Sequence, residues 1–230
     1  MKNIVLLTGA GISAESGIKT FRDADGLWEG HNVMQVASPQ GFAANPTLVL
    51  DFYNQRRKQL LSVTPNKAHA AITELQKHFN VTVITQNVDD LHERAGNNNV
   101  LHLHGELLKA RCTKKESDVT DWTKDLNLGD VSKNGNQLRP HIVWFGEEVP
   151  LLEKAAKITE TADILIIIGT SMQVYPAASL VHYVPNGTPI YFIDPKPSIK
   201  KTDFNNLTII SKTAVNGLPT LVSSLIDTML

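Results

Sequence analysis

The sequence has a single cysteine, Cys112, among 230 residues. One thiol excludes an intramolecular disulfide, and it excludes a zinc site built from cysteine pairs. Long apolar runs are also missing, because the longest, Ile164–Ile168, is much too short to span a bilayer. Met1–Asn3 leads directly into Ile4–Leu7, which is too brief for the apolar core of a signal peptide. Together these absences predict a cytoplasmic protein.

Neither sign of charge is in excess. The chain has 22 Lys and Arg against 23 Asp and Glu, a formal net charge of -1. This balance gives no electrostatic reason to expect nucleic acid or a membrane surface as a partner. Hydrophobic residues make up 42% of the chain and charged residues 20%, as in ordinary globular proteins. We therefore expect no nucleic acid and no membrane partner. The sequence does not set the oligomeric state, and we favour a monomer.

Apolar, β-branched runs alternate with helix-like segments along most of the chain. The strongest runs are predicted to be buried strands: Ile4–Leu7, Val81–Ile84, Ile142–Phe145, Ile164–Ile168 and Ile190–Ile193, with Val100–Leu103 and Leu207–Ile210 as weaker candidates. The helix-like segments are Thr47–Leu61, Lys67–Phe79, Leu151–Thr161, Ala177–Tyr183 and Leu218–Leu230. Strands without polar alternation, interleaved with helices, predict an α/β fold with a doubly wound, parallel, Rossmann-like sheet.

Two stretches do not fit this alternation. Residues 30–68 are rich in helix-like sequence, and residues 109–139 are polar with few apolar anchors. We predict that these insertions form a smaller module. The Rossmann-like core then comprises residues 1–29, 69–108 and 140–230 of one domain that spans residues 1–230.

A glycine-rich turn follows the first predicted strand. Gly9, Gly11 and Ala14 satisfy the pattern G-x-G-x-x-G/A, in which small residues let backbone N–H groups approach a pyrophosphate. The alternative is a tight turn that binds no ligand. A hydride-transfer enzyme would also need an acidic residue at the end of a second strand, but Glu29 follows a segment with no strand pattern. The turn therefore predicts a dinucleotide that is bound differently.

Three further predicted strands end in polar residues, at the edge where parallel sheets bind ligands. These ends carry Gln86, Asn87 and Asp89, then His102 and His104, then Gly169, Thr170 and Ser171. Helix capping explains one of the first three residues, and less readily all of them. Either histidine has the ordinary pKa of a general base at neutral pH, and the spacing alone does not choose between them.

Taken together and in this order, the motifs resemble those of the sirtuin family. The resemblance rests on Gly9–Ser13, Ser16–Ile18, Phe21-Arg22, Gly26–Trp28, Thr85–Asp89, Leu103–Glu106 and Gly169–Ser171 with Val174 and Pro176. It implies a catalytic domain that deacylates lysine in proteins or peptides and consumes NAD. In that family the acyl oxygen attacks C1′ of the nicotinamide ribose, nicotinamide leaves, and the products are free lysine and 2′-O-acyl-ADP-ribose.

The resemblance also implies roles for residues at matching positions. His104 would be the base on the ribose hydroxyls, and Asn87 would be the second catalytic residue. The residues implied to bind NAD are Gly9, Ala10, Gly11, Ser13, Glu15, Phe21, Arg22, Trp28, Gln86, Asn87, Val88, Asp89, Gly169, Thr170, Ser171, Asp194 and Ala214. The segment to which the substrate peptide would add as a strand includes Val143, Phe145, Gly146 and Glu147.

Phe52–Arg57 resembles the sirtuin branch that removes acidic acyl groups. Ala37, Tyr53 and Arg56 match the positions that line the acyl pocket in that branch. Tyr53 and Arg56 are three residues apart and share a helix face, and arginine binds carboxylates bidentately. The alternative is a half-exposed tyrosine beside a solvated arginine. We expect desuccinylase or demalonylase activity beside deacetylase activity.

The cysteine count marks a departure from the family, since most sirtuins hold a structural zinc with two cysteine pairs. Cys112 stands where the first pair would begin, but Lys115 occupies the position of its partner. Nothing like the second pair occurs in residues 130–138. We predict that no metal is bound and that Trp122, Leu126 and Leu128 pack the small module instead.

Two other functions stay open at this point. A non-catalytic module that binds NAD or ADP-ribose would have no need for His104 beside the polar strand ends. An NAD glycohydrolase or a mono-ADP-ribosyltransferase breaks the same glycosidic bond, and the sequence does not exclude either.

Overall fold

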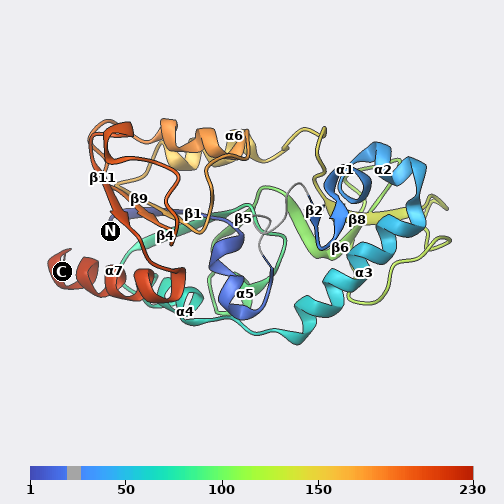
Figure 1. Cartoon of the computed structure of the whole chain (residues 1–230), viewed down its shortest axis with the longest axis horizontal. Coiled ribbons are helices and arrows are strands. Elements are labelled where there is room, and N and C mark those ends of the chain that lie inside the picture. Colours follow the sequence, from blue (N-terminus) through green and yellow to red (C-terminus); the bar gives the residue numbers. More distant parts are fainter. Residues whose placement is uncertain (20–26, 230) are drawn as a thin grey trace.

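The computed structural model describes residues 1–19 and 27–229, which form a larger and a smaller lobe (Figure 1). The larger lobe is built on a six-stranded sheet with the order β11-β10-β9-β1-β4-β5, in which every neighbouring pair is parallel. The smaller lobe holds a three-stranded antiparallel sheet with the order β7-β6-β8. The predicted α/β fold with a smaller module is therefore confirmed. Among the described residues, no helix has the length and apolar character needed to cross a membrane.

The strands of the main sheet coincide with apolar runs in the sequence. Their bounds are β1 (Asn3–Thr8), β4 (Asn80–Thr85), β5 (Val100–His102), β9 (Ile164–Ile168), β10 (Ile190–Ile193) and β11 (Leu207–Ile210). Ile4 and Leu6 contribute to the core on one face of the sheet, and Val5 and Leu7 contribute to the core on the other. Both faces of the strands are buried, which explains the absence of polar alternation.

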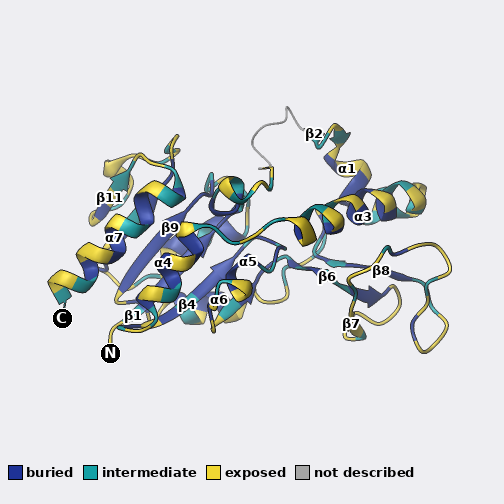
Figure 2. Ribbon diagram, turned by 90° about the horizontal axis from the view of Figure 1, so that it is seen from below, coloured by how far each residue is buried: buried dark blue, intermediate teal, exposed yellow. Residues whose placement is uncertain are grey.

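Helices cover the two faces of this sheet (Figure 2). One face packs against α4 (Lys67–Leu75) and α7 (Ala214–Met229), and the other against α6 (Leu152–Thr159) and the 3₁₀ helix η4 (Ala177–Tyr183). Helix α7 begins earlier than the predicted Leu218. Position 217 lies inside this helix, and glycine fits there because a Cβ would come 2.7 Å from the Ile193 side chain.

The smaller lobe is formed mainly by three helices and the antiparallel sheet. The bounds are β2 (Leu27–Trp28), β3 (His31–Asn32), α1 (Val33–Val36), α2 (Pro39–Ala44), α3 (Pro46–Ser62), β6 (Gly105–Cys112), β7 (Val119–Asp121) and β8 (Leu138–Ile142). Helix α3 starts sharply because Pro46 occupies its first turn and Asn45 Oδ1 accepts a hydrogen bond from Leu48 N at 3.0 Å.

Short helical segments complete the described part of the chain. They are η1 (Ala10–Ile12), η2 (Ala14–Ser16), α5 (Leu91–Arg94) and η5 (Lys201–Asp203). The glycine turn after β1 thus continues into 3₁₀ helices and not into a long α-helix.

One predicted strand was wrong. Ile142–Phe145 does not belong to the main sheet, because β8 ends at Ile142 and pairs antiparallel with β6. The apolar run suggested a buried central strand, whereas β8 is an edge strand that contains Pro140, a residue that edges tolerate. The small sheet begins at Gly105 and ends at Ile142, so it reaches into ranges that the sequence assigned to the core.

The packing of the small module was predicted in part. Leu126 is buried with Leu50, Ala110, Cys112 and Leu138, and Trp122 packs against this cluster. Leu128 is 55% exposed, so its predicted place in the core was wrong. It lies in the turn that contains Gly129, whose φ is +93°.

Candidate functional site

The candidate site lies at the carboxyl edge of the main sheet. The chain leaves β1 toward β4 on one side, and β9 lies on the other side of β1. This reversal of strand order is where doubly wound sheets form a ligand crevice. The ends of β1, β4, β5 and β9 therefore bring together the polar residues that the sequence placed after separate strands.

Two glycine turns interlock at the centre of this edge. Gly9 N donates to Ile168 O at 3.0 Å and Gly11 N donates to Gly169 O at 2.8 Å. A Cβ on Gly11 would lie 2.5 Å from Gly169 Cα, and Gly169 itself has a φ of +61°. Contact between the two turns is thus sufficient reason for these glycines. It also keeps side chains out of the turn, as an approach to a pyrophosphate requires.

Asn87, Ser13 and Asp89 form a buried hydrogen-bonded chain beside the glycine turn. Asn87 Nδ2 donates to Ser13 Oγ at 3.1 Å, and Ser13 Oγ donates to Asp89 Oδ2 at 3.0 Å. Burial raises the pKa of Asp89 to about 6, although hydrogen bonds from Leu91 N and Ser13 oppose this shift. Gln86 Nε2 donates to Thr170 Oγ1 at 3.1 Å, which connects the end of β4 to the turn after β9.

His102 and His104 differ in what their ring nitrogens contact. His102 Nδ1 lies 3.0 Å from Asn87 O and its Nε2 lies 2.7 Å from Glu93 Oε1. Burial would lower the pKa of His102, but the hydrogen bond and charge of Glu93 outweigh it and raise the pKa above its ordinary value. His102 thus has both ring nitrogens occupied, with Nδ1 on the Asn87 carbonyl and Nε2 on the Glu93 carboxylate.

His104 uses one nitrogen for positioning. Its Nδ1 lies 3.0 Å from Gln86 O, and because a carbonyl only accepts, Nδ1 carries the proton. Nε2 of the neutral ring then carries a lone pair. Burial lowers the pKa of His104, against the opposing effect of the Gln86 carbonyl. The ring is therefore neutral near pH 7, which is the state a general base needs.

The residues expected at the adenosine half gather around the β9 and β10 ends. Asp194 is buried at the end of β10 and its Oδ1 accepts a hydrogen bond from Lys196 N at 2.8 Å. Ser171 O accepts from Ser198 Oγ at 2.6 Å. Glu15 Oε2 accepts from Val215 N at 3.2 Å, so Glu15 lies at the start of α7 beside the buried Ala214.

The other predicted cofactor residues lie in two separate places. Ala10 opens η1, whereas Trp28 and Val88 line a cavity on the side of the small lobe. Phe21 and Arg22 lie outside the described residues. Glu29 follows a two-residue strand of a separate hairpin, so it does not end a strand of the main sheet.

The expected acyl pocket is a cavity of about 50 Å³ whose lining includes Trp28, Tyr53, Arg56 and Val88. Tyr53 is fully buried, and its hydroxyl accepts a hydrogen bond from Trp144 Nε1 at 2.9 Å. Burial raises the pKa of Tyr53 well above its usual range, against the effect of that hydrogen bond, so the hydroxyl stays protonated. Arg56 lines the same cavity as Tyr53 and its side chain is only 16% exposed, so it is not a freely solvated arginine. Ala37 is buried close by in the lobe's core.

The expected peptide segment connects the base to the small lobe. Val143 N donates to His104 O and Phe145 N donates to Ala37 O, both at 2.9 Å. Phe145 and Gly146 are exposed, whereas Glu147 points into the lobe. Glu147 accepts hydrogen bonds from Arg111 Nη2 at 3.0 Å, from Arg139 Nη1 at 2.6 Å, and from Trp144 N at 2.8 Å. The structure thus places Glu147 where it fixes the segment from behind.

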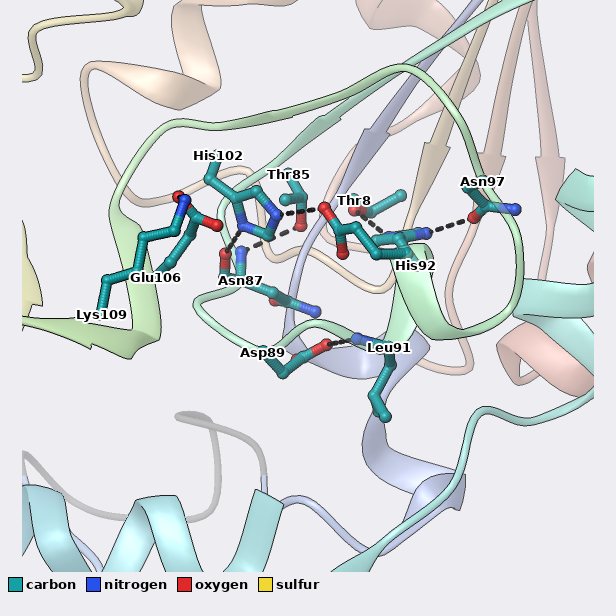
Figure 3. Close-up of polar contacts among 11 residues, drawn as sticks. Thr8, Thr85, Asn87, Asp89, Leu91, His92, Asn97, His102, Glu106 and Lys109 are labelled. Atoms are coloured by element: carbon teal, nitrogen blue, oxygen red, sulfur yellow. Dashed lines mark hydrogen bonds and ion pairs between the residues drawn. The ribbon is translucent and has the colours of Figure 1, made fainter. Parts of the chain in front are cut away.

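Sequence reasoning gave no role to several buried polar residues. His92 Nε2 lies 3.1 Å from Thr8 Oγ1, and His92 Nδ1 lies 2.8 Å from Asn97 Oδ1 (Figure 3). Arg139 stacks over the Trp144 ring, with 3.2 Å between its Cζ and the ring centroid. A histidine in the polar motif was a signal for His92, but Arg111 and Arg139 sit in a polar stretch that shows no signal of its own.

Cys112 is buried, and its Sγ accepts a hydrogen bond from Lys114 N at 3.4 Å. In the part of the chain that the structure describes, no three His, Cys, Asp or Glu side chains gather as a metal site would require. The absence of bound zinc stays a prediction.

The model of the Sir2 family matches residues 9–176. The chain is similar to an NAD-dependent protein deacylase from Helicobacter pylori strain ATCC 700392 / 26695, with 60% identity over 227 residues that cover 99% of each chain.

Solved structures agree with this result. The chain resembles a Sir2 homolog in complex with NAD, with 40% identity and a TM-score of 0.89, over 100% of this chain and 91% of that one. It also resembles a Sir2 complex with a p53 peptide and NAD+, with 28% identity and a TM-score of 0.75, over 97% of this chain and 92% of that one.

Proposed function

Because the chain belongs to the Sir2 family, we propose that it is an NAD-dependent deacylase of lysine in proteins or peptides. The observation that carries the proposal is the His104 ring, oriented by the Gln86 carbonyl at 3.0 Å, beside a buried set of amides and hydroxyls. NAD is the co-substrate, and the products are nicotinamide, free lysine and 2′-O-acyl-ADP-ribose.

The residues at the sheet edge suit the two ends of such a ligand. NAD supplies an activated glycosidic bond at C1′ of the nicotinamide ribose. Gln86 and Asn87 offer amide donors and acceptors, as recognition of a carboxamide and of ribose hydroxyls requires. Gly9, Gly11 and the backbone of η1 keep the pyrophosphate position clear of side chains, and Gly169–Ser171 with Asp194 holds the adenosine half.

His104 provides the base. Its Nδ1 proton is held by Gln86 O, so Nε2 accepts a proton from a ribose hydroxyl and the resulting charge is shared with that carbonyl. Asn87 directly follows Gln86, whose carbonyl orients the base, and it is held at two points, since His102 binds its carbonyl and Ser13 binds its side chain. Asn87 is therefore held in one orientation toward the reacting end.

The peptide is proposed to add as a strand along Val143–Gly146. This segment is exposed at Phe145 and Gly146, and Val143 is tied to the backbone of His104. Backbone pairing gives affinity with little dependence on the peptide's sequence. The acyl-lysine then enters between this segment and α3.

The acyl group is proposed to include succinyl and malonyl beside acetyl. Tyr53 and Arg56 line the same cavity, and a neutral tyrosine hydroxyl and a guanidinium both donate to a carboxylate. A charge-assisted hydrogen bond contributes about 1.5–3 kcal/mol. That corresponds to a preference on the order of 10- to 100-fold.

The test is mass spectrometry of acetyl-, succinyl- and malonyl-lysine peptides, each with and without NAD. We expect the acyl mass to be lost only when NAD is present. Peptides that keep their acyl groups, or lose them without NAD, would contradict the proposal. A cytoplasmic location and a monomeric state stay predictions.

A further inference from the structure

Glu29 occupies a backbone position that suits other residues better. Strands β2 and β3 pair Trp28 with His31, which leaves Glu29 and Gly30 as a two-residue turn. Their φ angles are 51° and 80°. Two positive φ angles are typical of a type I′ hairpin turn. Asn, Asp and Gly tolerate such angles, whereas the Cβ of a glutamate makes them sterically unfavourable. A strained residue of this kind suggests a role for its side chain.

The Glu29 carboxylate lies against Arg56. Glu29 Oε1 is 3.1 Å from Arg56 Nη1, and Glu29 Oε2 is 3.1 Å from Lys19 Nζ. The Glu29 and Arg56 side chains are 13% and 16% exposed, whereas Lys19 is 70% exposed. The pair with Arg56 is therefore the less screened of the two. Glu29 also lines the same cavity as Tyr53.

Arg56 keeps hydrogen-bonding capacity despite this partner. Its Nε and Nη1 are buried and make no hydrogen bond among the described residues, although Nη1 is within ion-pair distance of Glu29. Its guanidinium lies 5.3 Å from the centroid of the Phe52 ring, which supplies no hydrogen-bond acceptor of comparable strength. A second carboxylate in the cavity would accept hydrogen bonds from these donors. This is favourable because a buried charged donor without an acceptor costs free energy.

We propose that Glu29 determines acyl specificity by competing with the substrate's carboxylate for Arg56. The inference rests on the proposed function, because it assigns a resident competitor to the acyl pocket. With a neutral acetyl group, Glu29 keeps Arg56 paired and the pocket is electrically balanced. With a succinyl group, the incoming carboxylate has to displace Glu29 from Arg56 or share Arg56 with it. The two negative charges then repel each other.

The first variant to test is Glu29→Gln, which keeps the shape and removes the charge. We expect kcat/KM for a succinyl-lysine peptide to rise about tenfold through a lower KM, as loss of a partly buried competing ion pair implies. We expect kcat/KM for the matching acetyl peptide to stay within about threefold. Glu29→Asn suits the positive φ and should show the same change, which separates the charge from the strain of the turn.

Arg56→Met tests whether Glu29 acts through Arg56. In the Arg56→Met background, Glu29→Gln should no longer change the ratio of succinyl to acetyl turnover. Glu153→Gln is the matched control, because it removes the carboxylate of an exposed ion pair with Lys157 on α6. It should leave the ratio unchanged.

Two results overturn the inference while the enzyme remains a deacylase. One is a ratio that Glu29→Gln and Glu29→Asn leave unchanged; the other is an effect of Glu29→Gln that persists in full without Arg56. A wild-type protein that removes no acyl group in the presence of NAD overturns the proposed function, and the inference with it. The two failures are therefore distinguishable.

Discussion

Replacing Glu147 with alanine should strongly destabilise the small lobe. The carboxylate accepts hydrogen bonds from Arg111, from both terminal nitrogens of Arg139, and from Trp144 N. The Arg111 and Arg139 side chains are only 5% and 9% exposed. Glu147→Ala would leave two buried guanidinium groups without their carboxylate and would release the turn that follows Trp144.

The magnitude follows from the burial of this network. Removing one partner of a buried ion pair costs about 3–5 kcal/mol, because the remaining charge stays out of water. A domain is typically stable by only about 5–15 kcal/mol, so this loss is a large share of the total. Burial raises the pKa of Glu147, but Arg139 and Trp144 N outweigh it and lower the pKa. The contribution is therefore present above the ordinary glutamate pKa and is lost as the pH falls through the lowered value.

The assay is urea unfolding of wild type, Glu147→Ala, Glu147→Gln and the neighbouring Glu148→Ala. Glu148 is exposed, so its loss should change stability by no more than about 0.5 kcal/mol. Glu147→Gln should fall between the two alanine variants because it keeps one acceptor for Trp144 N. The KM for peptide should rise with Glu147→Ala, since Val143 and Phe145 belong to the same segment. A destabilisation by Glu147→Ala no larger than that by Glu148→Ala would refute this reasoning.

Three further predictions concern the site. His104→Ala should lower deacylation of every acyl peptide by about 10²–10⁴-fold while calorimetry still detects NAD binding, and retained activity would move the base elsewhere. Arg56→Met should impair turnover of succinyl peptides by roughly 10- to 100-fold and that of acetyl peptides much less; equal losses would reject the acyl assignment. Burial lowers the pKa of His92 to about 4, so His92 binds a proton less readily in the folded protein than in the unfolded chain. The stability that a neutral His92 gives is therefore full above pH 6.5 and is lost as the pH falls toward 4. In His92→Gln the free energy of unfolding should therefore depend on pH less steeply by about 1.4 kcal/mol per pH unit near pH 5, and identical slopes in urea titrations would count against this.

The main sheet was predictable because its strands are buried on both faces. Runs such as Ile164–Ile168 and Ile190–Ile193 carry no polar residue, and they appear as strands with those bounds. The small sheet was not predictable from the same signal. Its strand β6 contains Lys109 and Arg111, and its edge strand β8 contains Pro140. These strands form a separate three-stranded sheet, so they lack the uniformly apolar sequence of the main sheet's strands.

The site was predictable in the positions of its motifs and not in their contacts. The order of motifs located Gln86, Asn87 and both histidines at strand ends. Only the structure separates His102, which has two occupied nitrogens, from His104, because Glu93 and the backbone carbonyls reach them through the fold. The two arginine partners of Glu147 lie 8 and 36 residues away in sequence, and no local pattern encodes such pairs.

The most direct test of the central claim is whether loss of NAD depends on acyl-lysine. Purified protein is incubated with NAD alone, with NAD and an unmodified peptide, and with NAD and the acylated peptide, and all products are identified by mass spectrometry. We predict that NAD is consumed only with the acylated peptide, with one nicotinamide and one O-acyl-ADP-ribose formed for each lysine released. NAD loss at the same rate without acyl-lysine, yielding free ADP-ribose, would contradict the account and identify a glycohydrolase.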